Sequence, residues 1–237
     1  MRRSISIIIP AYNEENRLGA SLDKIRSYLA ASDWEFSEIL IVDDGSRDGT
    51  KEVARKAGVR VLENPGNRGK GYTVRHGMLE ARGDWVLYSD ADLSAPIEEL
   101  EKLWAAVERE KAQVAIGSRA VDRSLVGVHQ PRAREMMGRF FNLMMRVVTG
   151  LPFRDTQCGF KLFEGKTARE VFSRQQLEGF GFDVEVLFIA RQQRYKAVEV
   201  PVRWDNVEGT KVSLWLGAKA FVDPLKIRWN GVKGRYK

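Results

Sequence analysis

The chain is organised around the stretch Gly83-Asp-Trp-Val-Leu-Tyr-Ser-Asp90-Ala91-Asp92-Leu-Ser-Ala-Pro96. Its apolar and aromatic first half predicts a buried strand, and Pro96 is typical of the first turn of a following helix. Side chains two residues apart in an extended chain point the same way, so Asp90 and Asp92 can converge on one divalent cation. An Asp-x-Asp match is weak evidence by itself. It gains weight at the carboxyl end of a central strand, where open α/β sheets bind their ligands.

Strands and helices alternate along the first half of the chain. The expected strands are residues 4–10, 38–43, 59–63, 114–118 and the run leading to residue 90, and the expected helices are residues 14–31, 48–57, 97–111 and one ending near residue 83. This alternation predicts right-handed crossovers and a mostly parallel sheet covered by helices on both faces, which is an α/β, Rossmann-like fold. Periodicity weakens after Arg119, where we place the boundary between two halves of the chain.

Three acidic turns follow the first, second and fourth expected strands, at residues 10–15, 43–50 and 90–92. We expect all three to open onto one crevice. Ser46 is equally compatible with a helix cap, but a cap leaves Asp43 unexplained. A carboxylate that ends a buried strand is costly unless a polar group meets it, such as a base edge or a ribose hydroxyl. Glu14 is compatible with a helix start, and Tyr12 with either a rim aromatic or a nucleobase stack.

Composition limits the classes of partner and compartment. The net charge of +7 favours anionic partners, which include nucleic acid, phosphorylated small molecules and an anionic membrane surface. A single cysteine, Cys158, excludes an internal disulfide, so we interpret it as a packing residue in a reducing compartment. Residues 1–9 resemble a first strand rather than a signal peptide. No apolar run is long enough to predict a membrane-spanning helix.

Taken together, the three turns resemble the family 2 inverting glycosyltransferases, which have a GT-A type nucleotide-sugar-binding fold. The matching motifs are Ile9-Pro-Ala-Tyr-Asn-Glu-Glu15, Val42-Asp-Asp-Gly-Ser-Arg-Asp-Gly-Thr50 and Asp90-Ala-Asp92, in the family's order and spacing. The resemblance implies a donor site made by Pro10, Ala11, Tyr12, Glu14, Asp43, Ser46, Asp90, Ala91 and Asp92, with Asp90 and Asp92 holding Mg2+ or Mn2+. The loop 64–71 is not a P-loop, because Tyr72 follows Gly71. It resembles a family 2 loop in which Lys70 lies near phosphate, although a solvated turn is equally compatible.

The second half carries an arginine-bearing apolar helix near residues 134–149. Arg139 and Arg146 make a membrane span costly, so we expect an interfacial helix or a buried one with snorkelling arginines. The motif Arg134-Glu-Met-Met-Gly-Arg139-Phe-Phe-Asn142 resembles polyprenyl-phosphate sugar synthases. Residues 155–163, 182–185 and 208–211 look most like dolichyl-phosphate glucosyltransferases, with dolichyl-phosphate mannose synthases similar but different within residues 155–160.

This resemblance implies transfer of a hexose, with glucose favoured, from a nucleotide-diphosphate sugar, with UDP-glucose favoured, to a polyprenyl phosphate with inversion. Asp92 and Arg119 would act on the departing diphosphate, and Arg134, Arg139 and Lys211 would orient the lipid phosphate. Asp155 would orient these arginines. A phosphate acceptor arrives largely ionised and needs no protein base. The alternatives are a GDP-mannose-dependent mannosyltransferase, a sugar-hydroxyl acceptor with Asp155 or Glu185 as base, and a non-enzymatic binder of phosphate or nucleic acid.

The expected organisation is a donor half at residues 1–118, an acceptor half at residues 119–211 and a basic aromatic tail at residues 212–237. Aromatic and cationic side chains together suit a nucleic acid or a membrane interface. Because no nucleic-acid-binding module is recognisable, we expect the tail to contact an anionic membrane and no nucleic acid to bind. Relatives of this kind carry spanning segments that these residues lack. We therefore expect peripheral attachment to the cytoplasmic face of a membrane.

Overall fold

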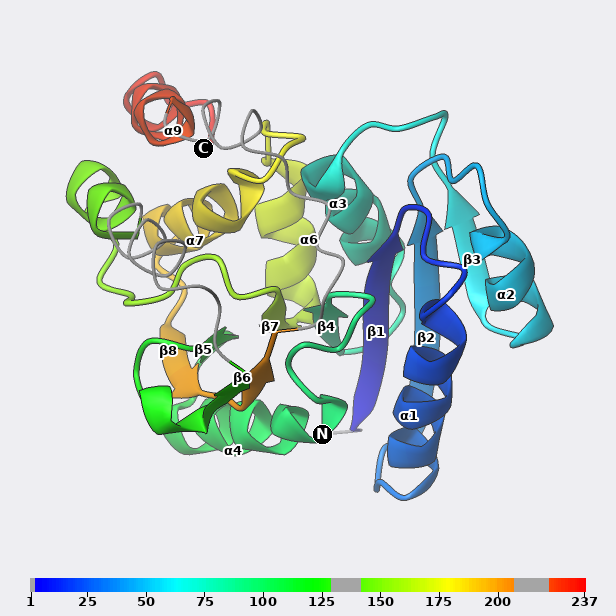
Figure 1. Ribbon diagram of the computed structural model, residues 1–237. Coiled ribbons are helices and arrows are strands. Elements are labelled where there is room, and N and C mark those ends of the chain that lie inside the picture. The colour runs from blue at the N-terminus through cyan, green and yellow to red at the C-terminus, as the bar shows by residue number, and fades with distance from the viewer. Residues whose placement is uncertain (1–2, 129–141, 207–221) are drawn as a thin grey trace.

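The fold is an α/β sandwich built on one seven-stranded sheet (Figure 1). A computed structural model describes residues 3–128, 142–206 and 222–237 of the chain. The strands of the sheet are β1 (Ser4–Ala11), β2 (Phe36–Asp43), β3 (Arg60–Glu63), β4 (Trp85–Ser89), β5 (Val114–Ser118), β7 (Phe160–Glu164) and β8 (Ala197–Pro201). Their order is β3-β2-β1-β4-β7-β5-β8. Only β7 pairs antiparallel with its neighbours, so the predicted mostly parallel sheet is confirmed.

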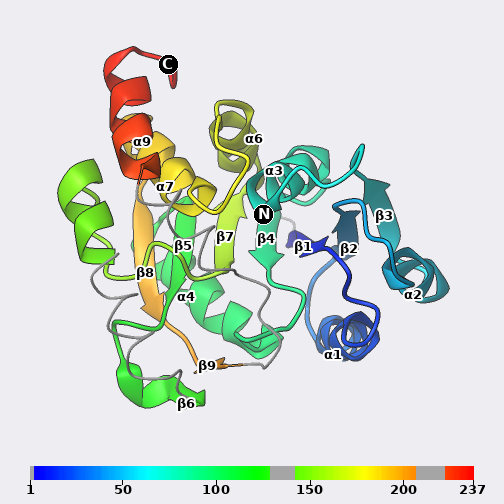
Figure 2. The same cartoon turned by 45° about the horizontal axis from the view of Figure 1, so that its top comes forward.

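Helices cover both faces of this sheet, as Figure 2 shows. They are α1 (Leu18–Ala30), α2 (Thr50–Lys56), α3 (Lys70–Glu80), α4 (Leu100–Glu110), α6 (Gly165–Ser173), α7 (Phe182–Gln192) and α9 (Asp223–Val232), with a further helix at residues 142–149. Helices α1, α2 and α4 pack on one face, and α3, α6 and α7 pack on the other. A short ladder of β6 (Val126–Val128) and β9 (Trp204–Asp205) lies apart from the main sheet. No helix in the described ranges combines the length and apolar character that crossing a bilayer requires.

Strand β1 lies inside the sheet, between β2 and β4, and its side chains are apolar on both faces. Ile5, Ile7 and Ile9 pack under α1 and α4, whereas Ile8 packs under α3 on the opposite face. A strand buried on both sides has a continuous rather than an alternating apolar pattern. Each of these isoleucines is at most 1% exposed, which corresponds to roughly 1.5–3 kcal/mol of stabilisation apiece.

Strand β7 was not predicted from the sequence. It lies antiparallel between β4 and β5, and its Phe160 and Phe163 are fully buried on opposite faces of the sheet. Residues 155–159, which precede β7, therefore arrive at the edge where β4 ends. Strands β7 and β8 both come from the second half of the chain and complete the sheet begun by the first half.

Helix α1 starts later than expected, and the tail contains a helix that the sequence did not predict. Helix α1 begins at Leu18 rather than at Glu14, because residues 15–17 form a separate turn and the N-cap residue Arg17 has a φ of -125°, outside the helical region. The tail contains α9, which has Pro224 in its first turn and buries Ile227, and Tyr236 beyond the end of α9 is buried as well. Helix α9 contacts α7, as Figure 1 shows.

Candidate active site

Three loops meet at the carboxyl edge of β2, β1 and β4, because these strands are adjacent and parallel. The first two loops are joined by hydrogen bonds. The Asn13 backbone N–H donates to Ser46 Oγ at 2.9 Å, and the Arg47 N–H donates to Asn13 Oδ1 at 2.8 Å. The Glu14 N–H donates to Thr50 Oγ1 at 2.7 Å. Ser46 therefore holds the first loop against the second, which adds a structural task to its predicted donor-binding role.

Asp43 ends β2 and is only 1% exposed. Its Oδ2 accepts hydrogen bonds from the backbone N–H groups of Gly45 at 3.1 Å and Ser46 at 3.0 Å. Its Oδ1 is buried and has no hydrogen-bond partner in the described part of the chain. A buried oxygen without a hydrogen-bond partner lowers the free energy of unfolding by about 1–3 kcal/mol. The arrangement suits a ligand that brings an N–H or O–H group to Asp43.

The neighbouring Asp44 was not predicted as a site residue, yet it fixes the glycine-rich loop 64–71. Its Oδ1 accepts from Asn64 Nδ2 and from the Arg68 backbone N–H, both at 2.9 Å, and its Oδ2 accepts from the Gly69 N–H at 2.8 Å. Gly45 has a φ of +74° and lies so close to Gly66 that a Cβ would come within 2.7 Å of the Gly66 carbonyl carbon. The only sequence signal for this role is the second aspartate of Asp43-Asp44-Gly45.

The loop 64–71, which Asp44 fixes, places Lys70 beside the acidic turn after β4. Lys70 begins α3, and its Nζ lies 2.6 Å from Asp90 Oδ1. Burial alone lowers the pKa of the Lys70 ammonium, but the carboxylates of Asp90 and Asp183 outweigh burial and leave the pKa raised. Lys70 is therefore charged and paired with Asp90, whereas a lysine in a solvated turn would have no such partner.

The geometry of the Asp-x-Asp turn differs from the expected one. Strand β4 stops at Ser89, and the Leu93 N–H donates to the Asp90 carbonyl at 3.1 Å, so the two carboxylates project from a turn and not from an extended strand. Asp92 Oδ1 accepts from the Ser94 N–H at 3.0 Å. On the other side, the Asp90 N–H donates to the carbonyl of Gly159 at 3.2 Å. A Cβ at Gly159 would come within 2.2 Å of Asp90 Oδ2, so any larger residue there would displace the Asp90 carboxylate.

Arg17 is a second site residue that the sequence did not reveal. Its guanidinium pairs with the Glu14 carboxylate, with Nη2 2.7 Å from Oε1. The hydrogen bond to Glu14 raises the pKa of Arg17, and the charges of Asp92 and Asp90 add to this effect. Glu14, predicted to bind the donor, therefore also holds a cation beside the acidic pair.

No group of three or more metal-ligating side chains gathers anywhere in residues 3–128, 142–206 and 222–237. The candidate protein ligands are the two carboxylates of Asp90 and Asp92. One or two carboxylates completed by substrate phosphate oxygens and water are the usual protein site for Mg2+. The donor set at this turn therefore fits a hard divalent cation that arrives together with a diphosphate.

Arg119 and Asp155 form the other charged part of the crevice. Arg119 follows β5, and its Nε and Nη2 donate to Asp155 Oδ2 at 2.6 Å and Oδ1 at 2.9 Å. Asp155 is fully buried, and burial alone raises the pKa of its carboxyl, but Arg119 holds that pKa below the ordinary value. The Arg119 guanidinium also lies over the Trp204 ring, 5.4 Å from its centroid. Asp155 thus orients Arg119, whereas the acceptor arginines that it was predicted to orient, Arg134 and Arg139, lie outside the described residues.

Glu185, an alternative base from the sequence, is placed elsewhere. It is fully buried, Oε1 accepts from the Tyr236 hydroxyl at 2.7 Å, and Oε2 accepts from the backbone N–H groups of Gln176 and Leu177. Both oxygens are thus occupied by structural contacts. Cys158 is buried, and burial raises the pKa of its thiol to about 12, which agrees with a packing role.

The remaining predicted residues divide into two groups. Pro10 and Ala11 end β1 at the crevice edge, with Tyr12 directly after them. The Ala91 carbonyl accepts a hydrogen bond from Ser21 Oγ at 2.7 Å. The predicted acceptor residues Arg134, Arg139 and Lys211 lie outside the described residues, as does the first part of the predicted helix 134–149.

Comparison with known proteins identifies the class. The family model described as glycosyl transferase family 2 matches residues 6–172. The chain therefore belongs to glycosyl transferase family 2, and the protein is a glycosyltransferase with a GT-A type fold. It is 39% identical over 225 residues to a dolichyl-phosphate beta-glucosyltransferase of Drosophila melanogaster, covering 88% of this chain and 69% of the relative. It is 36% identical over 254 aligned residues to the Homo sapiens dolichyl-phosphate beta-glucosyltransferase, covering 99% and 78% respectively.

Solved structures resemble the fold at lower identity. One is the glucosyl-3-phosphoglycerate synthase of Mycobacterium tuberculosis in complex with Mn2+, uridine diphosphate and glucosyl-3-phosphoglycerate, with a TM-score of 0.70, 20% identity, and coverage of 96% of this chain and 80% of that one. Another is the mannosyl-3-phosphoglycerate synthase of Rubrobacter xylanophilus, with a TM-score of 0.71, 21% identity, and coverage of 98% and 75%. At this identity the likeness shows the shared fold.

Proposed function

We propose that the protein transfers glucose from UDP-glucose to a polyprenyl phosphate, with inversion at the anomeric carbon. The observation that carries this proposal is the identity of 33% to 39% to relatives named dolichyl-phosphate beta-glucosyltransferase. Such alignments cover between 88% and 99% of the chain. The geometry of the crevice supports the donor, the cation and the acceptor parts of this reaction separately.

The donor part rests on Asp43. Its buried and unpaired Oδ1 lies at the end of β2, where an N–H of a nucleobase or a hydroxyl of a ribose would satisfy it. Pro10, Ala11, Tyr12 and Ala91 stay predictions for the walls of this subsite. Uridine is favoured because a structure of similar fold was solved with uridine diphosphate.

Asp90 and Asp92 would hold Mg2+ or Mn2+. Bound there, the ion would neutralise negative charge on the departing diphosphate. The chain supplies two cations of its own at this place. Lys70 pairs with Asp90. The pKa of Arg17 is raised by its hydrogen bond to Glu14 and further by the charges of Asp92 and Asp90. These two side chains would attract the diphosphate to the crevice and orient it there.

The surroundings of the two candidate bases, Asp155 and Glu185, support a phosphate as the acceptor. The pKa of Asp155 is held low by Arg119, and both oxygens of Glu185 are engaged in structural hydrogen bonds. Neither is suited to take a proton from a sugar hydroxyl, whereas a lipid phosphate needs no base. Arg119, oriented by Asp155, would face the phosphates. Arg134, Arg139 and Lys211 remain predicted ligands of the lipid phosphate by resemblance.

The surface around α9 supports the proposal that the protein acts at a membrane surface. Its exposed large apolar residues are Val222, Leu225, Trp229 and Val232 on or beside α9, with Leu143 and Val147 on the helix 142–149. Both helices lie beside α7 in Figures 1 and 2. Lys233 lies over the Trp229 ring, 4.6 Å from its centroid. Apolar and cationic groups together match the interface of an anionic membrane, and we place the protein peripherally on the cytoplasmic face.

A transfer assay with matched donors and acceptors tests the proposal. Purified protein is incubated with labelled UDP-glucose or GDP-mannose, with polyprenyl phosphate or a soluble sugar as acceptor, and with Mn2+ or EDTA. We expect label in the lipid fraction only with UDP-glucose, polyprenyl phosphate and Mn2+. Label from GDP-mannose would favour a mannosyltransferase. Label on the soluble sugar would favour a hydroxyl acceptor.

A further inference from the structure

We propose that Tyr236 and Glu185 are positioning residues for Lys70, acting through residues 175–179. The consequence is that the carboxyl-terminal helix α9 helps to shape the donor crevice. This inference rests on the proposed function only in assigning Lys70 to the donor diphosphate. The physical connection is carried by hydrogen bonds and close contacts in three steps.

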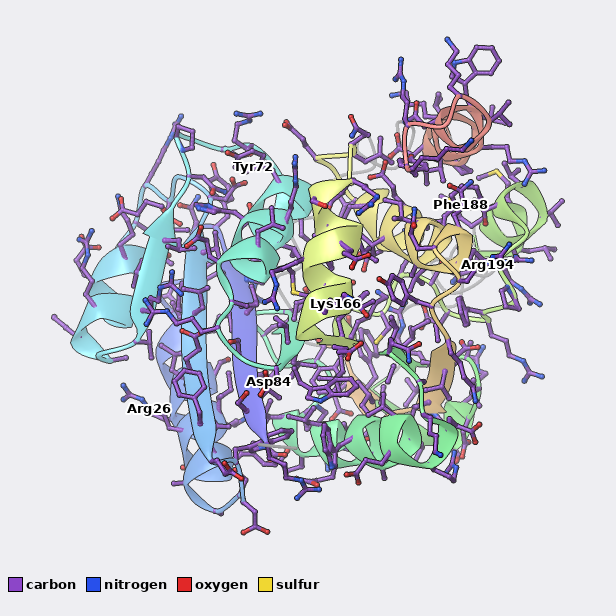
Figure 3. The ribbon with its side chains drawn as sticks, turned by 180° about the vertical axis from the view of Figure 1, so that it is seen from behind. Arg26, Tyr72, Asp84, Lys166, Phe188 and Arg194 are labelled. Carbon is purple, nitrogen blue, oxygen red and sulfur yellow. The ribbon has the colours of Figure 1, made fainter. Side chains whose placement is uncertain are left out.

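The first step joins the end of the chain to α7. Tyr236 is fully buried although it is the penultimate residue, and its hydroxyl donates to Glu185 Oε1 at 2.7 Å. Its ring packs edge-to-face on Phe188, with centroids 6.1 Å apart. Figure 3 labels Phe188 where α7 meets α9. Asn230 of α9 donates to the same hydroxyl at 3.3 Å.

The second step joins α7 to an irregular segment. Glu185 Oε2 accepts from the backbone N–H of Leu177 at 2.8 Å and of Gln176 at 3.1 Å. Residues 175–178 belong to no helix or strand, so these N–H groups have no ladder partner and depend on the carboxylate. A buried carboxylate is costly unless its lone pairs are used. Here the Tyr236 hydroxyl donates to Oε1, and the two backbone N–H groups of the segment donate to Oε2.

The third step joins this segment to the first turn of α3. Gln175 Nε2 donates to the Gly71 carbonyl at 2.9 Å, and the Tyr72 N–H donates to the Glu178 carbonyl at 3.2 Å. A Cβ at Gly69 would come within 2.8 Å of the Glu178 carbonyl oxygen, and a Cβ at Gly71 within 2.7 Å of the Leu177 carbonyl oxygen. Lys70 stands between these two glycines. Its reach to Asp90 therefore depends on where residues 175–179 lie.

The test uses Tyr236→Phe, which removes one hydroxyl and keeps the ring. Tyr28→Phe is the matched control, because the Tyr28 hydroxyl also donates to a carboxylate, Glu101, but on the opposite face of the sheet. The two readouts are hydrogen exchange of the amides at residues 69–72 and 176–177, and the Kd for UDP with Mn2+. We expect exchange there to accelerate about tenfold and the Kd to rise about fivefold in Tyr236→Phe, with neither change in Tyr28→Phe.

A second background separates positioning from general destabilisation. In Lys70→Met, adding Tyr236→Phe should leave the Kd for UDP unchanged, because the positioned group is already absent. A further rise in that background, or exchange that accelerates only in residues 222–237, overturns the proposal. If Tyr236→Phe does not fold, Glu185→Gln replaces it with the same expected results. If the wild-type protein binds no UDP, the donor assignment fails, and the exchange at residues 69–72 alone decides the connection.

Discussion

Asp43 carries a buried carboxylate oxygen, Oδ1, that has no hydrogen-bond partner among the described residues, and we propose that the donor supplies one. Replacing Asp43 by Asn keeps one oxygen for the backbone N–H groups of Gly45 and Ser46 but loses the charge. We expect the Kd for UDP to rise roughly ten- to a hundredfold, because a hydrogen bond to a charged group contributes about 1.5–3 kcal/mol. Calorimetry measures this directly. Asp48→Asn is the control, since Asp48 caps the turn before α2 and Asn caps equally well.

Asp92 tests the cation. Asp92→Asn keeps an oxygen for the Ser94 N–H, so the turn and the melting temperature should be preserved. Turnover should fall at least about a hundredfold, because a carboxylate ligand of the ion is lost. Turnover of the wild-type protein should vanish with EDTA and return with Mn2+. If activity survived both the substitution and EDTA, the reaction would not require a divalent cation at Asp92.

Single residues of the site were predictable to different degrees. Asp90 and Asp92 were predictable because strand and helix patterns on either side locate a strand end. Asp44 and Arg17 were not, because their roles depend on the glycine-rich loop and on Glu14, whose positions only the folded chain defines. The sequence does not reveal the role of Lys70 for the same reason, since its partner Asp90 is twenty residues away along the chain and adjacent only after folding.

Among the elements, β7 shows why part of the sheet escaped prediction. Its run Phe-Lys-Leu-Phe-Glu contains Lys161, and a lysine normally argues against a buried strand. In the structure Lys161 is fully buried, with Nζ paired to Asp183 and stacked against the Tyr88 ring. A buried charge is stable only when its partner is buried with it. That partner comes from α7, so no local pattern could have revealed β7.

The ion pair between Arg119, which follows β5, and Asp155, which precedes β7, predicts how the free energy of unfolding depends on pH. Asp155 has a folded pKa below its unfolded value near 3.9, so its stabilisation is complete above about pH 5 and is lost as the pH falls through the unfolded and then the folded pKa. Asp155→Asn should lower the free energy of unfolding at pH 7 by roughly 3 kcal/mol, because Arg119 loses a buried partner. The difference should stay constant from pH 8 to 5 and shrink at lower pH.

Urea unfolding over this pH range measures both quantities. Asp122→Asn serves as the control, because Asp122 also has a lowered pKa but is exposed and only caps a short turn. It should change the free energy of unfolding little at any pH. A difference for Asp155→Asn that grows between pH 5 and 8 would show that the Arg119 pair is not its source.

At the scale of the whole molecule, exposed apolar side chains among the described residues gather on and beside α9, and we propose that this surface faces a bilayer. The double substitution Leu225→Ser and Trp229→Ser removes two side chains that are 60% and 59% exposed, so folding should be unaffected. Partitioning onto anionic vesicles should fall at least about tenfold, because each inserted side chain contributes on the order of 1 kcal/mol or more. Sedimentation with vesicles measures it.

Phe36→Ser is the matched control, since Phe36 is 43% exposed at the start of β2 and lies on neither helix of the proposed membrane face. It should partition as the wild-type protein does, and both variants should bind UDP normally. Equal loss in the two variants would mean that exposed apolar area in general, rather than the α9 surface, governs binding.

The structure of the lipid product tests the central claim most directly. Purified protein is incubated with UDP-glucose, Mn2+ and a short polyprenyl phosphate, and the extracted product is analysed by mass spectrometry and by NMR of its anomeric proton. The account predicts one glucose joined through its anomeric carbon to the lipid phosphate, in the β configuration that inversion of the α-linked donor requires. An α-linked product, a mannosyl lipid, or free glucose with unchanged polyprenyl phosphate would contradict it.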